Sequence, residues 1–87
     1  MNTITADEFI AFLQNGVGKF ENTKIVGNVD FCELTVDGLH LDHVVFCGDV
    51  EGHVTVGEIS IRSLYCAYYS NIGPLCYTGR MIKDMAV

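Results

Sequence analysis

The sequence predicts a mainly β fold with a short N-terminal helix, contained in one domain. Its 87 residues are 49% hydrophobic and only 18% charged, which suits one small folded core and argues against disorder. Residues 5–14 carry apolar side chains at helical spacing, whereas residues 24–66 are rich in Val, Ile, Leu, Phe and Thr. In the second stretch, apolar residues come in pairs that recur every five residues. We divide the single domain 1–87 into a capping helix and turn (1–18), a β region (19–66) and a tyrosine-rich C-terminal closure (67–87).

Residues 5–14 are expected to form the helix. Thr5 is a suitable N-cap, and Glu8 three positions later completes a capping box. Asn15-Gly16 is a helix stop, because either residue can take the left-handed C-terminal conformation. A helix this short is marginal alone, so it should pack on the β region and cap one end of it. The stripe that would make this contact consists of Phe9, Ile10, Phe12 and Leu13.

A period of five residues runs through 29–66. Seven of eight five-residue blocks have apolar residues at their first and third places, and only the block 49–53 departs. Two residues two apart point to the same side of an extended segment. If a corner follows each block and turns the chain by about a quarter, four blocks close one coil with its apolar pairs inside. The pairs stand at 29/31, 34/36, 39/41, 44/46, 54/56, 59/61 and 64/66.

These pairs resemble the repeats of the pentapeptide-repeat proteins, and the stretch 25–31 is similar to the opening segment of divergent members. The resemblance covers roughly half of the chain. The family prefers Ala at the first place and Asp or Asn between the pair, whereas this sequence has Val, Leu or Ile first and only Asp30 in the middle. The resemblance implies a short right-handed β-helix of about two coils, capped by the helix.

A second interpretation stays open, in which one helix packs on a four- or five-stranded antiparallel sheet in an α+β fold. Residues 34–41 are typical of a hairpin, because Asp37-Gly38 separates two alternating triplets. Residues 48–52 would form the next loop, and residues 54–61 a second hairpin around Gly57-Glu58. This interpretation also explains why the block 49–53 departs from the period.

The charge of the chain is concentrated in the β region. The net charge is −6, which argues against a generic nucleic-acid-binding protein, because such a protein would need a basic footprint. Residues 25–61 contain seven acidic residues and no Lys or Arg, while the rest of the chain has four acids and five bases. In either fold at least four of the seven should face solvent. They are Asp30, Glu33, Asp37, Asp42, Asp49, Glu51 and Glu58.

These seven acids are the predicted partner-binding residues of a non-enzymatic protein. Carboxylates on strands about 4.8 Å apart would imitate duplex DNA, which carries one charge per about 1.7 Å of axis. The expected function is an inhibitor that blocks the DNA-binding channel of a bacterial complex, such as a CRISPR effector or a topoisomerase. Acidic pentapeptide-repeat proteins that bind gyrase support the analogy. Small acidic domains without catalytic motifs are also typical of phage-encoded inhibitors, including anti-CRISPR proteins.

The expected partner is therefore a positively charged nucleic-acid-binding protein, with no direct contact to nucleic acid or membrane. The simplest alternative is an acidic surface that serves solubility alone. A further alternative is an assembly module that dimerises through its C-terminal end, where aromatic residues would form an apolar patch. The tyrosines in question are Tyr65, Tyr68, Tyr69 and Tyr77.

Neither catalysis nor a cofactor is expected. The sequence has no Gly-rich phosphate loop, GxSxG or HExxH motif, and the histidines near Asp42, Asp49 and Glu51 should point outward with the other polar residues. A small metal-binding protein is the remaining alternative, although no cysteine spacing matches a standard zinc site. The residues available to it are Cys32, Cys47, Cys66, Cys76, His40, His43 and His53. The first eight residues do not resemble a signal peptide, so a cytoplasmic location in a bacterial host cell is expected.

Overall fold

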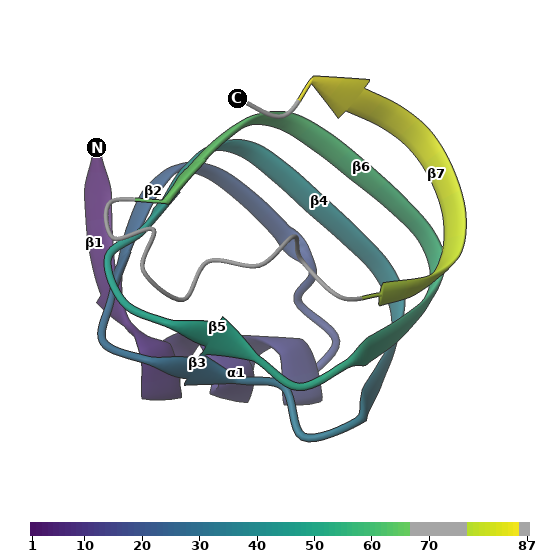
Figure 1. The fold of residues 1–87 in the computed structure, drawn as a ribbon, viewed down its shortest axis with the longest axis horizontal. Coiled ribbons are helices and arrows are strands. Elements are labelled where there is room, and N and C mark those ends of the chain that lie inside the picture. The colour runs from purple at the N-terminus through teal and green to yellow at the C-terminus, as the bar shows by residue number, and fades with distance from the viewer. Residues whose placement is uncertain (67–76, 86–87) are drawn as a thin grey trace.

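The computed structural model describes the backbone of residues 1–66 and 77–85 and the side chains of residues 1–63 (Figure 1). It is mainly β with one short N-terminal helix, as predicted. The elements are β1 (Asn2–Thr5), α1 (Ala6–Gln14), β2 (Lys19–Val26), β3 (Val29–Asp30), β4 (Leu34–Phe46), β5 (Val50–Glu51), β6 (Val54–Cys66) and β7 (Tyr77–Met85). No helix in the described residues is long and apolar enough to cross a bilayer.

Every strand pairing that the structure describes is parallel. One sheet has five strands in the order β1-β2-β4-β6-β7, and β3 pairs with β5 in a second, two-stranded sheet. Strands β4 and β6 are long and curved, and β3 and β5 lie across the interior from their arcs (Figure 1). The chain thus surrounds a single core.

The strand register follows the five-residue period. Leu34 lies beside Val54 and Val44 beside Leu64, twenty residues apart, which is the length of four blocks. Between β2 and β4, and between β3 and β5, the offset is twenty-one, as in Val29 beside Val50. The additional residue lies in 31–33. The offset of twenty-one explains why the block 49–53 departs from the five-residue pattern. Its inward-facing residue is the second of the block, Val50, instead of the first, and Val50 packs against the core.

The α+β alternative is compatible with one helix and a five-stranded sheet, but its antiparallel strand direction and its hairpins are wrong. Asp37-Gly38 lies inside β4 and Gly57-Glu58 inside β6. A two-residue hairpin turn needs a positive φ at one or both central residues. None of these four residues has a positive φ, so the chain continues through both positions.

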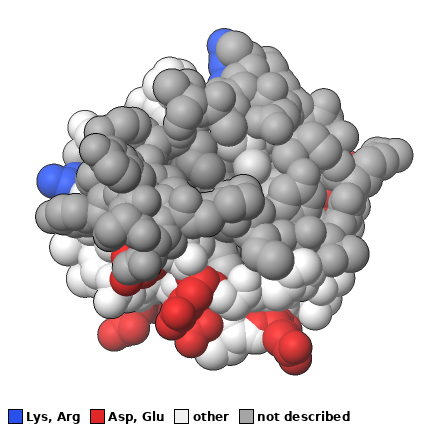
Figure 2. Space-filling model, in the orientation of Figure 1, with Lys and Arg blue, Asp and Glu red and all other residues white. Residues whose placement is uncertain are grey.

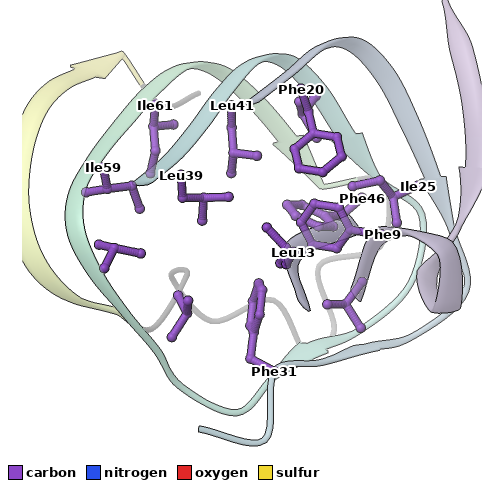
Figure 3. Close-up of a cluster of buried hydrophobic side chains, with 14 of the residues drawn as sticks. Phe9, Leu13, Phe20, Ile25, Phe31, Leu39, Leu41, Phe46, Ile59 and Ile61 are labelled. Atoms are coloured by element: carbon purple, nitrogen blue, oxygen red, sulfur yellow. The ribbon is translucent and has the colours of Figure 1, made fainter. Parts of the chain in front are cut away.

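The predicted apolar pairs fill the interior (Figure 3). Of the six pairs whose side chains are described, five are buried, and Leu34 and Val36 are half-buried and packed against the others. The pair 64/66 lies outside the described side chains. Intervening residues in the strands, such as Thr55, are exposed. The inward orientation of the pairs is therefore confirmed for residues 29–61.

Helix α1 begins with the predicted capping box. The Thr5 hydroxyl accepts a hydrogen bond from the Glu8 amide at 3.1 Å, and the Glu8 carboxylate accepts one from the Thr5 amide at 2.9 Å. Phe9 is fully buried, and its ring lies 4.8, 6.1 and 5.8 Å from the rings of Phe20, Phe31 and Phe46, respectively (Figure 3). The helix thus packs on strands and connections from successive parts of the chain.

Phe12, one of the four residues of the expected helical stripe, does not face the core. Phe12 is 41% exposed, whereas Ala6, outside the predicted stripe, is buried with Phe9 and Leu13. Ile10 is half-buried. The buried stripe is therefore narrower than the sequence suggests, with residues three and four positions apart facing the core.

Candidate functional site

The structure places the seven predicted acids outside the core, but not on one side. Four of them, namely Asp30, Glu33, Asp37 and Glu51, are exposed, and Asp42, Asp49 and Glu58 are half-buried. The expectation that at least four face solvent is confirmed. Their strand positions decide which of them lie together.

Four acids lie on or next to the β3–β5 sheet, and we call Asp30, Glu33, Asp49 and Glu51 the acidic side. Asp30 of β3 and Glu51 of β5 are register partners on adjacent strands. Asp49 precedes β5, and its amide donates a 3.0 Å hydrogen bond to the Asn28 side chain. In Figure 2, acidic side chains gather along the lower rim, on the side where Figure 1 places β3 and β5.

A tight turn after β3 fixes the Asp30 carboxylate. Its Oδ1 accepts a hydrogen bond from the Cys32 amide at 2.9 Å, as in an Asx turn, and Cys32 and Glu33 have φ values of 56° and 88°. A hydrogen bond to Asp30, its charge, desolvation and the charge of Glu51 together raise the pKa of the Cys32 thiol. The carboxylates of Asp30 and Glu51 therefore both act on the Cys32 thiol.

The other three acids lie elsewhere. Asp42 of β4 lies between Glu21 of β2 and Arg62 of β6 in the strand register. Its Oδ1 is 2.6 Å from Nδ1 of His43. Asp37 is in β4, and Glu58 of β6 has Arg80 of β7 as its register partner. The structure thus separates Asp37, Asp42 and Glu58 from the acidic side.

Basic residues are distributed in the opposite way. Within residues 1–63, the Lys and Arg residues are Lys19 and Lys24 on β2 and Arg62 on β6. Lys19 and Glu21 form an exposed ion pair at 3.4 Å. The register pair Glu21–Asp42 is thus accompanied by bases, whereas the pair Asp30–Glu51 has none on its sheet. The charge asymmetry of the sequence becomes, within these residues, an asymmetry between the two sheets.

The described surface also contains depressions that spacing alone did not indicate, and two of them are lined in part by the predicted acids. The larger, about 330 Å³, is lined by equal numbers of acidic and basic side chains on β2, β4 and β6. The smaller, about 170 Å³, lies between the end of α1 and residues 35–38. Asp37 is the only ionisable residue among its described lining residues. Because its walls come from separate segments, only the folded chain reveals it.

The features behind the metal-binding and self-association alternatives lie partly outside the described side chains. Within the described residues, no group of three or more His, Cys, Asp or Glu side chains could hold a metal ion. Cys32 is an exposed free thiol and Cys47 a half-buried one. The side chains of Tyr65, of Tyr77 and of the rest of the C-terminal closure are not described, so both alternatives stay predictions.

No protein-family model, curated protein or solved structure matches the chain. The functional assignment therefore depends on the geometry and charge of its own residues.

Proposed function

We propose that this chain is a non-enzymatic acidic binding protein whose acidic side binds a positively charged protein. The observation that carries the proposal is the Asp30–Glu51 pair, two exposed carboxylates at partnered positions on adjacent strands. Like charges placed directly opposite each other are destabilising. A partner that supplies Lys or Arg side chains would remove this cost, which gives the pair a role beyond solubility.

We infer further that the partner is a nucleic-acid-binding protein and that the acidic side occupies its nucleic-acid channel. Strands about 4.8 Å apart present carboxylates at a spacing that phosphate-binding Lys and Arg side chains can reach. The net charge of −6 would steer the encounter with such a channel and make binding sensitive to salt. A bacterial CRISPR effector complex or topoisomerase has a channel of this kind, and a phage-encoded inhibitor would have this size and charge.

The structure narrows the residues that we propose for this contact. Asp30, Glu33, Asp49 and Glu51 share the acidic side and would touch the partner. Asp37, Asp42 and Glu58 lie on other strands, and Asp42 and Glu58 would contribute through the long-range field. The proposal therefore predicts that removing acids of the acidic side weakens partner binding more than removing the same number of acids elsewhere.

A capture experiment with two matched variants tests this proposal. Asp30→Asn/Glu51→Gln removes the carboxylates of one register pair and keeps an oxygen for the Cys32 amide. Glu21→Gln/Asp42→Asn removes the other register pair, which has bases beside it. Each would serve as bait in a bacterial lysate at about 50 and 500 mM salt, where exposed charges are screened to different degrees.

The wild-type protein and the Glu21→Gln/Asp42→Asn variant should capture a DNA-binding complex at low salt only. The Asp30→Asn/Glu51→Gln variant should capture about tenfold less of it, because interfacial charges govern both the encounter and specificity. Equal loss of capture in both variants would mean that net charge governs binding, and not the acidic side. Capture that resists salt would contradict the proposal.

We also propose that the parallel sheet is one wall of a short right-handed β-helix of the pentapeptide-repeat kind. Offsets of twenty and twenty-one residues, inward apolar pairs and the β3–β5 pairing across the core support it. Parallel crossover connections are right-handed in nearly all proteins. Adding one full coil to the chain tests this architecture, because a stacked repeat can accept another repeat.

A further inference from the structure

A pocket lies where the end of α1 meets the first half of β4. Its volume is about 170 Å³, and its lining includes apolar side chains from Leu13, Val17 and Val36. Leu13 is 2% exposed and belongs to the core. Among the described residues of the lining, Asp37, which is exposed, is the only ionisable one. The pocket therefore combines an apolar wall with one carboxylate.

The end of α1 adds negative potential to this pocket. A helix carries partial negative charge at its C-terminus, and α1 has no basic residue in its last turn to offset it. The carbonyls of Ala11, Phe12 and Leu13 accept hydrogen bonds from backbone amides of residues 15–17. Gln14, the last residue of α1, itself lines the pocket. This potential is independent of Asp37.

We propose that this pocket binds a cationic side chain with an aliphatic stem, an arginine or lysine of the protein partner. The stem would lie against Leu13, Val17 and Val36, as such stems commonly cover apolar surface. The charged head would bond to the Asp37 carboxylate and lie near the helix end. The assignment of the ligand to a partner rests on the proposed function, whereas the preference for a cation rests on the pocket alone.

Titrations followed by backbone amide NMR test the pocket without any partner. The probes are n-butylguanidinium, n-butylammonium and, as the uncharged control, 1-pentanol. Either cation should shift the amides of Gly16, Gly18 and Val36 in a saturable way, and 1-pentanol should not. Tighter binding of the guanidinium would assign the site to arginine, and tighter binding of the ammonium to lysine.

Two variants identify the groups that bind the cation. Asp37→Asn should weaken cation binding about fivefold or more, since a charge-assisted bond is lost. Gln14→Lys, at an exposed position in the last helical turn, should also weaken it by placing a cation beside the site. Because lysine is favourable there, this variant keeps the test valid if Asp37→Asn fails to fold. Glu33→Gln removes an equal charge from the acidic side and should leave the affinity within about twofold.

Unchanged affinity in both pocket variants, or equal binding of 1-pentanol, would overturn the proposal. The two experiments separate this inference from the proposed function. If the probes do not bind while capture of a lysate protein still depends on Asp30 and Glu51, only the pocket inference is wrong. If the probes bind and no capture occurs, the pocket stands and the proposed function is wrong.

Discussion

Three residues that are not glycine share the left-handed conformation at one corner of successive turns of the chain. Asn22, His43 and Ser63 have φ values of 49°, 55° and 60°, and each follows a register partner in β2, β4 or β6. The left-handed region disfavours most side chains, and asparagine is among the residues that tolerate it best. The same backbone conformation therefore recurs at equivalent positions of β2, β4 and β6, about twenty residues apart.

Close backbone contact requires glycine at position 18. A Cβ added to Gly18 would overlap the carbonyl oxygen of Gly38, whereas one added to Gly16 would meet nothing within 4 Å. Gly16→Ala should cost about 1 kcal/mol, because its φ of 86° is strained for alanine. Gly18→Ala should cost about 3 kcal/mol or more, because backbone must move. Urea unfolding measures both, and equal losses would show that the contact with Gly38 is unimportant.

The pKa of the Cys32 thiol reports on the acidic side. Asp30→Asn should lower this raised pKa and speed alkylation of Cys32 by iodoacetamide near pH 8, because it removes the negative charge beside the thiol. Peptide mass spectrometry measures the rate, with Asp42→Asn as the control. An unchanged rate in Asp30→Asn would mean that the carboxylate does not act on the thiol.

The same raised pKa has a consequence for stability. Below the pKa of the unfolded thiol, Cys32 is protonated in both states and its contribution to stability is fully present. As the pH rises through that value and then through the higher folded pKa, the unfolded state ionises first, so this contribution is lost. The wild-type free energy of unfolding should therefore decline more steeply in mildly alkaline solution than that of Asp30→Asn.

Helix α1 is held mainly by one side chain. Phe9 is fully buried among three other rings, whereas Phe12 on the same helix is 41% exposed. Phe9→Ala should cost about 3–5 kcal/mol, because it leaves a cavity between the helix and the strands. Phe12→Ala should cost less than about 1 kcal/mol. Comparable losses in chemical unfolding would contradict the described position of the helix.

At the level of elements, local signals predicted α1 well and strand direction poorly. The N-cap, the capping box and the Asn15-Gly16 stop are all encoded within a few residues. Strand β1 was not predicted, because Asn2–Thr5 has no strong pattern and gains its structure by pairing with β2 about twenty residues away. Asp37-Gly38 looked like a turn, yet its conformation is set by the neighbouring long strand β6.

The whole molecule depends on a repeat length of about twenty residues. In the proposed β-helix, duplicating residues 34–53 adds one full coil. The chain should then still unfold cooperatively, with a denaturant m-value that rises with the added buried surface. Inserting a copy of residues 39–43 shifts every later apolar pair by about a quarter of a coil and should disrupt packing. Circular dichroism and urea unfolding compare the two. Tolerance of the short insertion with failure of the long one would contradict the β-helix.

For the candidate site, the sequence predicts which acids lie outside the core but not which of them lie together. The sequence could predict that the acids lie outside, because each stands between or beside the inward apolar pairs. It could not predict that Asp30 and Glu51 lie together while Asp42 lies beside Arg62, because the register changes from twenty-one to twenty residues at 31–33. The pocket beside Asp37 depends in addition on where α1 ends.

Competition with DNA tests most directly whether the acidic side occupies a nucleic-acid channel. The captured partner would be titrated with labelled duplex DNA in the presence of the wild-type protein or the Asp30→Asn/Glu51→Gln variant. The wild-type protein should displace the DNA completely and more weakly as salt is raised, and the variant should need about tenfold more protein. A complex that holds the DNA and the wild-type protein together would contradict the proposed binding of the acidic side in the channel.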